Sequence, residues 1–436
     1  MPHSLPVPTP PIAEATGLPW NVAVDDAVVA IAEARARHGD TFVVHSGREH
    51  YLFTFSPVGV ESFYALPEEI ASKGLADYLM LRRKLPDEIF EGRRTLPGSL
   101  FRRDDVAAFL VNLDQALEQT VSELGNEGTV DLFALTRRLG HRMGLASWAG
   151  PGSAQGDTFD RLVSSFDTLD GSDAFVHPDA MAAVAAFDKR AERSALAEVT
   201  ELVAIALRHF DSGHDATETL FGRIVGAWSS EPPDVRTRGI ALDVALIHIA
   251  SMSNLMAALG WAFVDLLEHP TQLRRVADGD HDLARRCALE STRMAQRSIM
   301  SRAVLAPVEL DTGEVSYRVP AGWMIATLLP LLNTSSAPGF EQWDPGRWHR
   351  NRLADPSALA SPMLVTAFGH GKHSCPAQPF SLAAMAAAMI RLSSTYSMTP
   401  QWTSHPRPVS AQIGGVARAA GVCPVGYVSR RRSDEV

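Results

Sequence analysis

The sequence predicts a mainly α-helical fold with small β-sheets, organised as a single domain over residues 1–436. Helical periodicity of apolar residues runs through most segments from Pro57 to about Asp211. A long apolar stretch, Leu246–Leu267, has the length and composition of a central buried helix. Strand-like segments lie near both ends of the chain, which predicts small sheets rather than a large one.

The composition is that of a soluble globular protein with a substantial core. The 436 residues are 46% hydrophobic and 21% charged, and the formal net charge of −10 argues against binding to nucleic-acid phosphates. Cys287, Cys375 and Cys423 are too few and too scattered for a disulfide framework, which favours a reducing compartment. The N-terminus lacks the basic and apolar regions of a signal peptide. We therefore expect a cytoplasmic protein.

Caps, turns and periodicity predict the elements of the first half. Residues 1–20 are rich in proline and are expected to form an extended arm on the surface. Residues 24–40 have the pattern of an amphipathic helix with acidic residues at its start. Residues 41–57 predict a β-hairpin that turns at Ser46-Gly47. Two of the clearest helical patterns cover residues 104–124 and 129–145.

The second half alternates between helices and strand-like segments. Residues 229–239 contain two prolines and are expected to form a loop before the apolar stretch. A shorter helix is expected to end near Met300, and residues 306–329 have the character of strands. Residues 381–396 predict a further helix.

The apolar stretch Leu246–Leu267 has roughly the length that spans a bilayer, so a membrane helix is one interpretation. However, His248, Asn254, Asp265 and several serines would be costly against lipid. A helix buried on all sides of a large protein explains these polar residues better. We therefore expect no membrane association.

The segment TAFGHGKHSCPAQPF, residues 366–380, surrounds Cys375 with glycines, histidines and prolines. A glycine-rich turn can direct backbone N–H groups at a thiolate, and the N-terminus of a following helix adds to this stabilisation. A buried structural cysteine is one alternative. A zinc site formed by His370, His373 and Cys375 is another, although no fourth ligand is visible. A phosphate-binding loop is excluded because Thr366 stands where glycine is required. The fourth interpretation is an axial thiolate ligand to haem iron.

The segment FGHGKHSC resembles the haem-binding loop of the cytochrome P450 superfamily, which runs Phe, two residues, Gly, three residues, Cys. Upstream, Glu290 and Arg293 resemble the Glu-x-x-Arg pair of the family. The segment WDPGRW resembles the one whose arginine, here Arg347, completes a buried Glu–Arg–Arg cluster. The resemblance covers essentially the whole chain and is to the soluble bacterial type. It implies the triangular-prism fold of the family, with a long central helix over the haem.

The resemblance also implies the cofactor and its ligands. Cys375 would be the metal ligand of haem b (iron protoporphyrin IX). His373 and Arg302 match family positions that bind haem propionates. A further propionate partner normally comes from an early helix that carries a tryptophan and an arginine. Arg102 and Arg103 lie in the corresponding region without the tryptophan, so this position stays unassigned.

Other residues of the loop match cofactor-binding positions of the family. Phe368, Gly369 and Gly371 correspond to the conserved spacing of the haem-binding loop. Ala377 stands where the family usually has glycine, and it would keep the following helix close to the haem edge. These four residues are therefore expected to bind the cofactor.

The predicted central helix departs from the family pattern. Family members usually carry an acid and an alcohol there, which help to deliver protons to dioxygen. Counting back from Glu268-His269-Pro270, where that helix normally ends, aligns the acid with Ser253 and the alcohol with Asn254. Ala250 and Ser251 fill two small positions, and a one-residue slip would place Ser253 at the alcohol site. The segment holds no carboxylate, and asparagine does not titrate near neutrality. These four residues are the expected catalytic residues.

The resemblance implies a haem-thiolate monooxygenase that inserts one oxygen atom of O2 into a small hydrophobic substrate in secondary metabolism. The alternative is atypical haem-thiolate chemistry, because Ser253-Asn254 replaces the acid–alcohol pair. It would be peroxide-dependent, isomerising or dehydrating, or a nitrene-type transfer. A haem-binding sensor without catalysis forms a third class.

The expected partners follow from the same resemblance. No Gly-x-Gly-x-x-Gly fingerprint for flavin or nicotinamide follows a strand, so electrons would come from a separate ferredoxin or flavodoxin. Residues 73–94 and a strand over residues 327–336 are expected to line the substrate pocket. The protein is expected to be a monomer that binds neither nucleic acid nor membrane. The basic residues expected to attract the redox partner are Arg350, Arg352 and Lys372.

Overall fold

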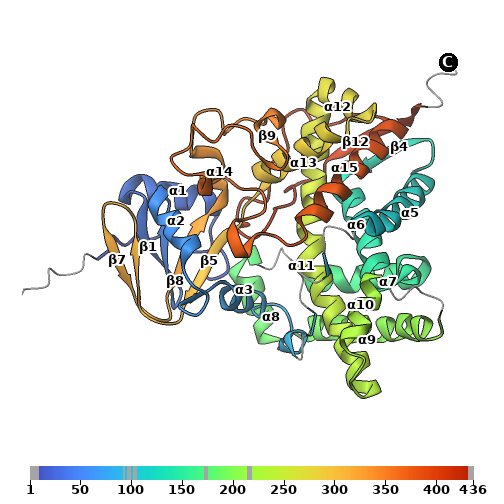
Figure 1. Cartoon of the computed structure of the whole chain (residues 1–436), viewed down its shortest axis with the longest axis horizontal. Helices are drawn as coiled ribbons and strands as arrows, with labels where there is room; N and C mark the ends of the chain where they lie inside the picture. The colour runs from blue at the N-terminus through green and yellow to red at the C-terminus, as the bar shows by residue number, and fades with distance from the viewer. Residues whose placement is uncertain are drawn as a thin grey trace, which may run out of the picture.

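The computed structural model describes residues 9–91, 94–95, 100–101, 106–170, 175–213 and 219–430. Figure 1 shows a part rich in strands at one end of the molecule and a larger helical part at the other. The helix Pro233–Glu268 (α11) runs through the helical part (Figure 1). The mainly helical architecture with small sheets agrees with the predicted fold class.

A five-stranded sheet combines strands from both halves of the chain. Its strands are β1 (Thr41–Ser46), β2 (Glu49–Thr54), β3 (Ala71–Ser72), β5 (Ile299–Val304) and β8 (Met324–Leu328). Their order in the sheet is β1-β2-β8-β5-β3. β1 and β2 pair antiparallel with Ser46 opposite Glu49, which confirms the predicted hairpin. β2 and β8 pair in parallel, whereas β8 and β5 pair antiparallel.

Three smaller sheets complete the strands that the structure describes. One has the order β11-β12-β4 and joins Tyr396–Pro400 (β11), Pro424–Ser429 (β12) and Glu127–Asp131 (β4). The others are the pairs β6 (Val308–Asp311) with β7 (Ser316–Val319), and β9 (Trp348–His349) with β10 (Arg352–Leu353). Strands β6, β7 and β8 lie within the predicted strand region, residues 306–329.

The remaining helices begin and end where the sequence supplies caps and prolines. Asp26, for example, accepts hydrogen bonds from the N–H groups of Val28 and Val29. The helices of the first half are α1 (Ala27–His38), α2 (Pro57–Ala65), α3 (Lys73–Leu81), α5 (Val106–Leu124), α6 (Leu132–Trp148), α7 (Gly156–Asp170), α8 (Pro178–Ala186) and α9 (Arg190–Asp211). Those of the second half are α10 (Leu220–Ala227), α12 (Pro270–Ala277), α13 (His281–Ala295), α14 (Leu329–Ser335) and α15 (Gln378–Thr395).

Helix α11 is the centre of the large hydrophobic core and packs against α6, α9 and α13. Among the described residues it is the helix long and apolar enough to cross a membrane, but 78% of its most apolar window is buried inside the protein. It also begins at Pro233, so most of the predicted loop at residues 229–239 is helical. Proline is favoured in the first turn of a helix, because the N–H that it lacks has no partner there.

Residues 1–8 of the predicted arm lie outside the described residues, and the rest of it, residues 9–20, is not a free arm. From residue 9 onward it packs against the five-stranded sheet, and Leu18 and Trp20 are buried in the core beside that sheet. The N–H of Ala13 donates to the carbonyl of Val43, and the N–H of Val43 donates to the carbonyl of Pro11. The apolar side chains and these backbone bonds outweigh the extended preference of the prolines.

Two predicted boundaries in the second half are wrong. Helix α13 ends at Ala295, so Met300 belongs to strand β5 instead. Residues 327–336, expected to be a strand at the substrate pocket, form the end of β8 and helix α14. Pro330 lies in the first turn of α14, and Leu329 and Leu332 are buried there. α14 packs against α13 and supports the core.

A chain of hydrogen bonds joins α6, α7 and α11 inside the helical part. The indole N–H of Trp148 donates to Nδ1 of His248 (3.0 Å), so the hydrogen of His248 lies on Nε2. That N–H donates to Nδ1 of His141 (2.9 Å), and Nε2 of His141 in turn donates to Asp167 (3.1 Å). Both imidazoles are buried and held in one neutral tautomer.

Candidate functional site

Cys375 lies in a tight loop between the short β9–β10 pair and helix α15. Its N–H donates to the carbonyl of Phe368 (2.8 Å), which closes the loop on itself. Gly369 and Gly371 have φ angles of +79° and +62°, a region that favours glycine. A Cβ at Gly369 would lie 3.3 Å from the carbonyl oxygen of His373. The glycines predicted to shape the loop are therefore required by its backbone.

The thiol of Cys375 faces the start of helix α15. Burial raises the pKa of Cys375 overall, and the backbone N–H groups of Ala377 and Gln378 near the sulfur offset part of this increase. This is the environment that stabilises a thiolate once a cation is bound to it. Ala377 has a φ of −85°, so no glycine is needed at that position.

The other two cysteines have different environments. Burial raises the pKa of Cys287 to about 12 and the pKa of Cys423 to about 11. Both thiols are buried and stay protonated near neutrality.

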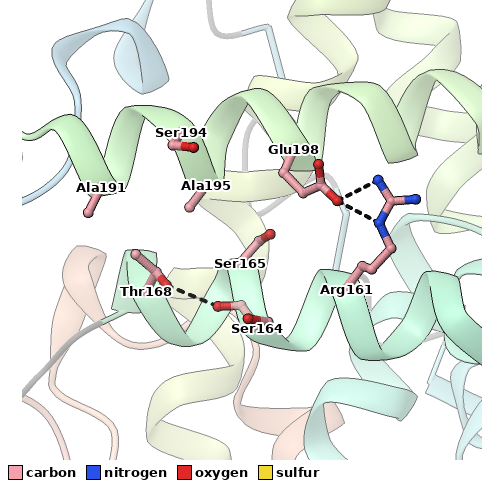
Figure 2. A pocket seen from close by; sticks show the side chains of 8 residues that line it. All are labelled: Arg161, Ser164, Ser165, Thr168, Ala191, Ser194, Ala195 and Glu198. Carbon is pink, nitrogen blue, oxygen red and sulfur yellow. Dashed lines mark hydrogen bonds and ion pairs between the residues drawn. The ribbon is translucent and has the colours of Figure 1, made fainter.

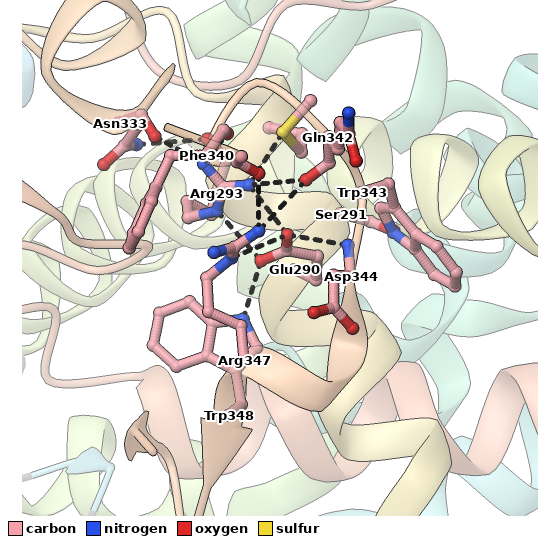
Figure 3. A network of polar contacts seen from close by, with 12 residues as sticks. Glu290, Ser291, Arg293, Asn333, Phe340, Gln342, Trp343, Asp344, Arg347 and Trp348 are labelled. Atoms are coloured by element: carbon pink, nitrogen blue, oxygen red, sulfur yellow. Dashed lines mark hydrogen bonds and ion pairs between the residues drawn. The ribbon is translucent and has the colours of Figure 1, made fainter. Parts of the chain in front are cut away.

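Glu290, Arg293 and Arg347 form one buried cluster, as predicted (Figure 3). Glu290 and Arg293 have side chains that are 0% exposed, and Arg293 donates two bonds to the carboxylate, of 2.8 and 2.7 Å. Arg347 donates to the same carboxylate at 3.3 Å and stacks on Phe340 at 4.1 Å. The indole N–H of Trp348 and the backbone N–H of Asp344 complete the shell of Glu290.

The cluster is connected to the cysteine loop through Asn333 of α14. Its side-chain amide donates to the carbonyls of Arg293 (3.0 Å) and Thr366 (2.9 Å), and its Oδ1 accepts from the N–H of Thr366 (2.9 Å). Gln296 adds a bond to the carbonyl of Ala367 (2.9 Å). The cluster therefore fixes the start of the loop that presents Cys375.

Sequence reasoning missed Asn333 and Trp348 as members of this support. Asn333 follows an apolar run that was assigned to a strand, so its side chain had no predicted partner. Trp348 directly follows Arg347, and that adjacency was the available signal. The indole N–H needs an acceptor when it is buried, and Glu290 provides one.

Between Gly239 and Leu267, helix α11 is buried around its whole circumference except at four positions. The residues that are not buried there are Ala250, Ser251, Ser253 and Asn254. These are the four residues that the sequence singled out as catalytic. They lie within about one turn of the helix, so they share one accessible stretch in the middle of a core helix.

The side chain of Asn254 is held by the C-terminal segment. Its Oδ1 accepts a hydrogen bond from the backbone N–H of Val416 (2.8 Å). A Cβ at Gly415 would lie 2.0 Å from that oxygen, and the φ of Gly415 is +64°, so glycine is required for this contact. Among the described residues the amide Nδ2 has no hydrogen-bond acceptor. It is therefore available as a donor.

His373 and Arg302 come together, although they lie on different elements. Nε2 of His373 and Nη2 of Arg302 contact the same oxygen of Glu68, at 3.3 and 3.4 Å. Arg302 is only 1% exposed and also binds backbone carbonyls. The two residues expected to bind a propionate thus already share one carboxylate. Arg102 and Arg103 lie outside the described residues.

The residues present fit a haem with a thiolate ligand. The Cys375 sulfur is half-enclosed and stabilised by two N–H groups, and a braced loop presents it. Arg302 offers a positive charge and His373 offers a ring nitrogen that can donate a hydrogen bond, a combination suited to a carboxylate. A zinc site is not favoured, because no group of three or more metal-binding side chains occurs among the described residues. The assignments of Cys375 and its neighbours to a cofactor stay predictions.

A separate pocket of about 480 Å³ lies between α7 and α9 (Figure 2). Hydroxyl-bearing and small side chains face each other across it, and the ion pair of Arg161 with Glu198 closes one end. Its lining consists of Arg161, Ser164, Ser165, Thr168, Ala191, Ser194, Ala195 and Glu198. None of these is a predicted site residue, so this pocket is distinct from the Cys375 site.

No family model matches the chain. The 24-hydroxycholesterol 7-alpha-hydroxylase of Homo sapiens is 21% identical over 429 residues, which cover 92% of this chain and 89% of the relative. The enzyme of the same name from Mus musculus is 24% identical, with 92% and 88% covered. Abscisic acid 8'-hydroxylase 1 of Oryza sativa subsp. japonica is 23% identical over 219 residues, which cover 45% of this chain and 43% of that protein.

These similarities agree with the geometry of the site. The relatives are hydroxylases, and two of them align along nearly the whole chain. They come from mammals and rice, so they do not bear on the expected soluble bacterial type. The mainly helical architecture with small sheets agrees with the cytochrome P450 fold that the sequence predicts. The fold, the braced cysteine loop and the hydroxylase relatives together support the cytochrome P450 superfamily as the family of this oxidoreductase.

Proposed function

We propose that the protein is a haem b-dependent monooxygenase that inserts one oxygen atom of O2 into a small hydrophobic substrate, in secondary metabolism. The observation that carries this proposal is the Cys375 thiol, which faces two backbone N–H groups at the start of α15. A thiolate-ligated haem, when bound, supplies the activation of dioxygen and the cleavage of its O–O bond. Glu290 and the two arginines have a structural role, because they brace the loop.

The residues of α11 would act on the substrate side. Asn254 can donate a hydrogen bond through Nδ2, but it does not titrate and cannot supply a proton. Ser251 and Ser253 carry hydroxyl groups that can pass a proton between neighbours, with water or the substrate as the source. In this proposal, Asn254 as a hydrogen-bond donor and the two serines as proton carriers together take the place of the family's acid–alcohol pair. The alternative, chemistry driven by peroxide or by rearrangement of the substrate, gains no support from hydroxylase relatives.

The substrate class follows from the relatives only in outline. By their names they act on 24-hydroxycholesterol and abscisic acid. We therefore infer a small, largely apolar molecule for this chain and leave its identity open. Residues 73–91, within the region expected to line the pocket, include α3 and contact β5.

We also propose a soluble cytoplasmic monomer of the bacterial type, which receives electrons from a ferredoxin or flavodoxin. Lys372, Arg350 and Arg352 are exposed on or near the cysteine loop and would attract an acidic partner. Such attraction is screened over roughly 8 Å at physiological ionic strength. Electron transfer that does not slow with added salt would contradict this role of the three residues.

The spectrum of the reduced, carbon-monoxide-bound protein tests the thiolate ligand. We expect a Soret band far to the red in the wild type and its loss in Cys375→Ala, because a thiolate donates electron density to the iron. Cys423→Ala is the matched control and should keep the band, since that thiol is buried and protonated. A Cys375→Ala protein that retains the band would disprove the assignment.

Turnover separates the monooxygenase from its alternative. We expect product from a panel of small apolar substrates with O2, reductant and a redox partner. Product formed only with hydrogen peroxide, or without any oxidant, would favour the alternative chemistry instead. Labelling with ¹⁸O2 then reports whether one oxygen atom enters the product.

A further inference from the structure

The carboxylate of Glu68 joins the two residues that are expected to bind the cofactor's carboxylates. Glu68 lies between α2 and β3, Arg302 lies in β5, and His373 lies two residues before Cys375. The guanidinium of Arg302 and the imidazole of His373 both contact Oε2 of Glu68, at 3.4 and 3.3 Å. A carboxylate of the protein therefore already sits at the position that suits a carboxylate of the cofactor.

Arg302 is the fixed member of this group. Its Nε donates to the carbonyl of Ala71 (2.8 Å), its Nη1 to Phe63 (3.3 Å) and its Nη2 to Leu66 (2.6 Å). The side chain is 1% exposed, and burial lowers its pKa. Glu68 adds the one negative charge in contact with the guanidinium among the described residues. A buried cation without such a partner would be costly.

Glu68 is the exposed member of the group. Its side chain is 44% exposed, and its contacts with Arg302 and His373 are long for ion pairs. Its shorter bonds go to the start of α3, where Oε1 accepts from the Ser72 hydroxyl (2.6 Å) and the N–H of Gly74 (2.8 Å), and Oε2 accepts from the N–H of Lys73 (3.1 Å). Burial alone would raise the pKa of Glu68, but these bonds lower it overall, so the carboxylate is charged.

We propose that Glu68 competes with a carboxylate of the bound haem for Arg302 and His373. The inference rests on the proposed function, because it assumes that this chain binds haem. Glu68 neutralises the buried guanidinium before the cofactor arrives and then gives up its two long contacts, while its bonds to the start of α3 remain. Two carboxylates on the same Nη2 and Nε2 atoms would repel each other, which favours exchange over sharing.

The rate of haem loss tests the competition. Glu68→Gln has the same shape and its Oε1 still accepts bonds from Ser72 and Gly74, but it carries no charge, and its amide nitrogen no longer accepts from the N–H of Lys73. We expect haem to leave this holoenzyme about fivefold more slowly than it leaves the wild type, as measured by transfer to excess apomyoglobin. Glu69→Gln is the matched control, because Glu69 is exposed and has no ion pair among the described residues. It should lose haem at the wild-type rate.

A second cofactor makes the test specific for carboxylates. Iron protoporphyrin IX dimethyl ester has no free carboxylate, so Glu68→Gln should not slow its loss. Faster haem loss in Glu68→Gln would show that Glu68 braces the site, and an unchanged rate would show that it takes no part. Either result overturns the competition but leaves the monooxygenase proposal intact. A wild-type protein that takes up no haem at all would contradict both.

Discussion

Asn254 is held in a single orientation by the backbone of Val416. An asparagine amide can present either its oxygen or its nitrogen to a neighbour, and a backbone N–H selects the oxygen. Nδ2 is then left as a donor on the accessible stretch of α11. The side chain can therefore donate to an acceptor atom, such as a carbonyl or ether oxygen, while Oδ1 stays bonded to the N–H of Val416.

Asn254→Asp tests this donor. The aspartate keeps an oxygen for Val416 but removes Nδ2, so kcat/KM for the substrate found in the panel should fall roughly tenfold. Hydrogen exchange of the Val416 amide should stay slow in this variant. An unchanged kcat/KM would mean that Nδ2 contacts nothing that reacts, and Ser253 would become the residue to test.

Gly415→Ala examines the same contact from the other side. A Cβ there would lie 2.0 Å from Oδ1 of Asn254, and the positive φ disfavours alanine. We expect faster hydrogen exchange at Val416 and a loss of kcat/KM similar to that of the Asn254 variant. Gly414→Ala is the control, since a Cβ at Gly414 meets nothing within 4 Å. Equal behaviour of the two glycine variants would contradict the contact.

At the scale of elements, the Glu290 cluster connects α13, α14 and the cysteine loop. Arg293→Ala would leave the Glu290 carboxylate buried with fewer partners, at a cost of about 3–5 kcal/mol in the free energy of unfolding. We expect this variant to be recovered mostly haem-free or insoluble. Arg286→Ala on the same helix removes only a surface pair with Asp282, whose side chain is 77% exposed, and should change stability little. Normal melting and haem content in Arg293→Ala would refute this role.

The histidine chain between α6, α7 and α11 predicts a pH dependence of stability. Burial lowers the pKa of His141 and His248 in the folded protein, whereas the unfolded chain takes up protons near pH 6.5. The contribution of these two neutral histidines to the free energy of unfolding is therefore fully present above about pH 6.5, and it is lost as the pH falls below that value. The loss amounts to about 1.4 kcal/mol per histidine and pH unit. A proton on Nδ1 of His141 would also break the hydrogen bond between the two imidazoles, because two N–H donors would then face each other.

His141→Gln checks this dependence. The amide offers a donor and an acceptor but cannot be protonated, so Tm should fall less between pH 7.5 and pH 5.5 than in the wild type. His281→Gln is the control, because His281 is exposed at the start of α13. It should follow the wild-type curve. If His141→Gln shows the wild-type pH dependence, the carboxylates of the protein cause the loss instead.

For the whole molecule, sequence patterns with strong local signals predicted the structure well. The β1–β2 hairpin, helices such as α6 and α15, and the Glu290 cluster follow from alternation, periodicity and charge at fixed spacing. The four residues of α11 that escape burial were also predicted as a group. They interrupt an apolar pattern with small and polar side chains, which is readable without a structure.

Other features depend on contacts between distant segments, and the sequence does not display them. Glu68 lies 234 residues from Arg302, and nothing in its neighbourhood marks it as the partner of that cation. Val416 lies 162 residues from Asn254. The buried residues 16–20 were predicted as part of a surface arm, because the nearby prolines gave a local preference that tertiary packing overrides. Local preference is a weak guide wherever long-range packing decides.

The order of strands in the five-stranded sheet has a consequence for biosynthesis. Strands β1 and β2 leave the ribosome early, but β2 pairs in parallel with β8, whose residues are made much later. At roughly 5–20 residues per second, the nascent hairpin waits on the order of ten seconds to a minute with an unpaired edge. Leu52 and Phe53, both buried in the finished sheet, are apolar residues of that waiting strand. We expect the nascent chain to need chaperone protection until β8 has emerged.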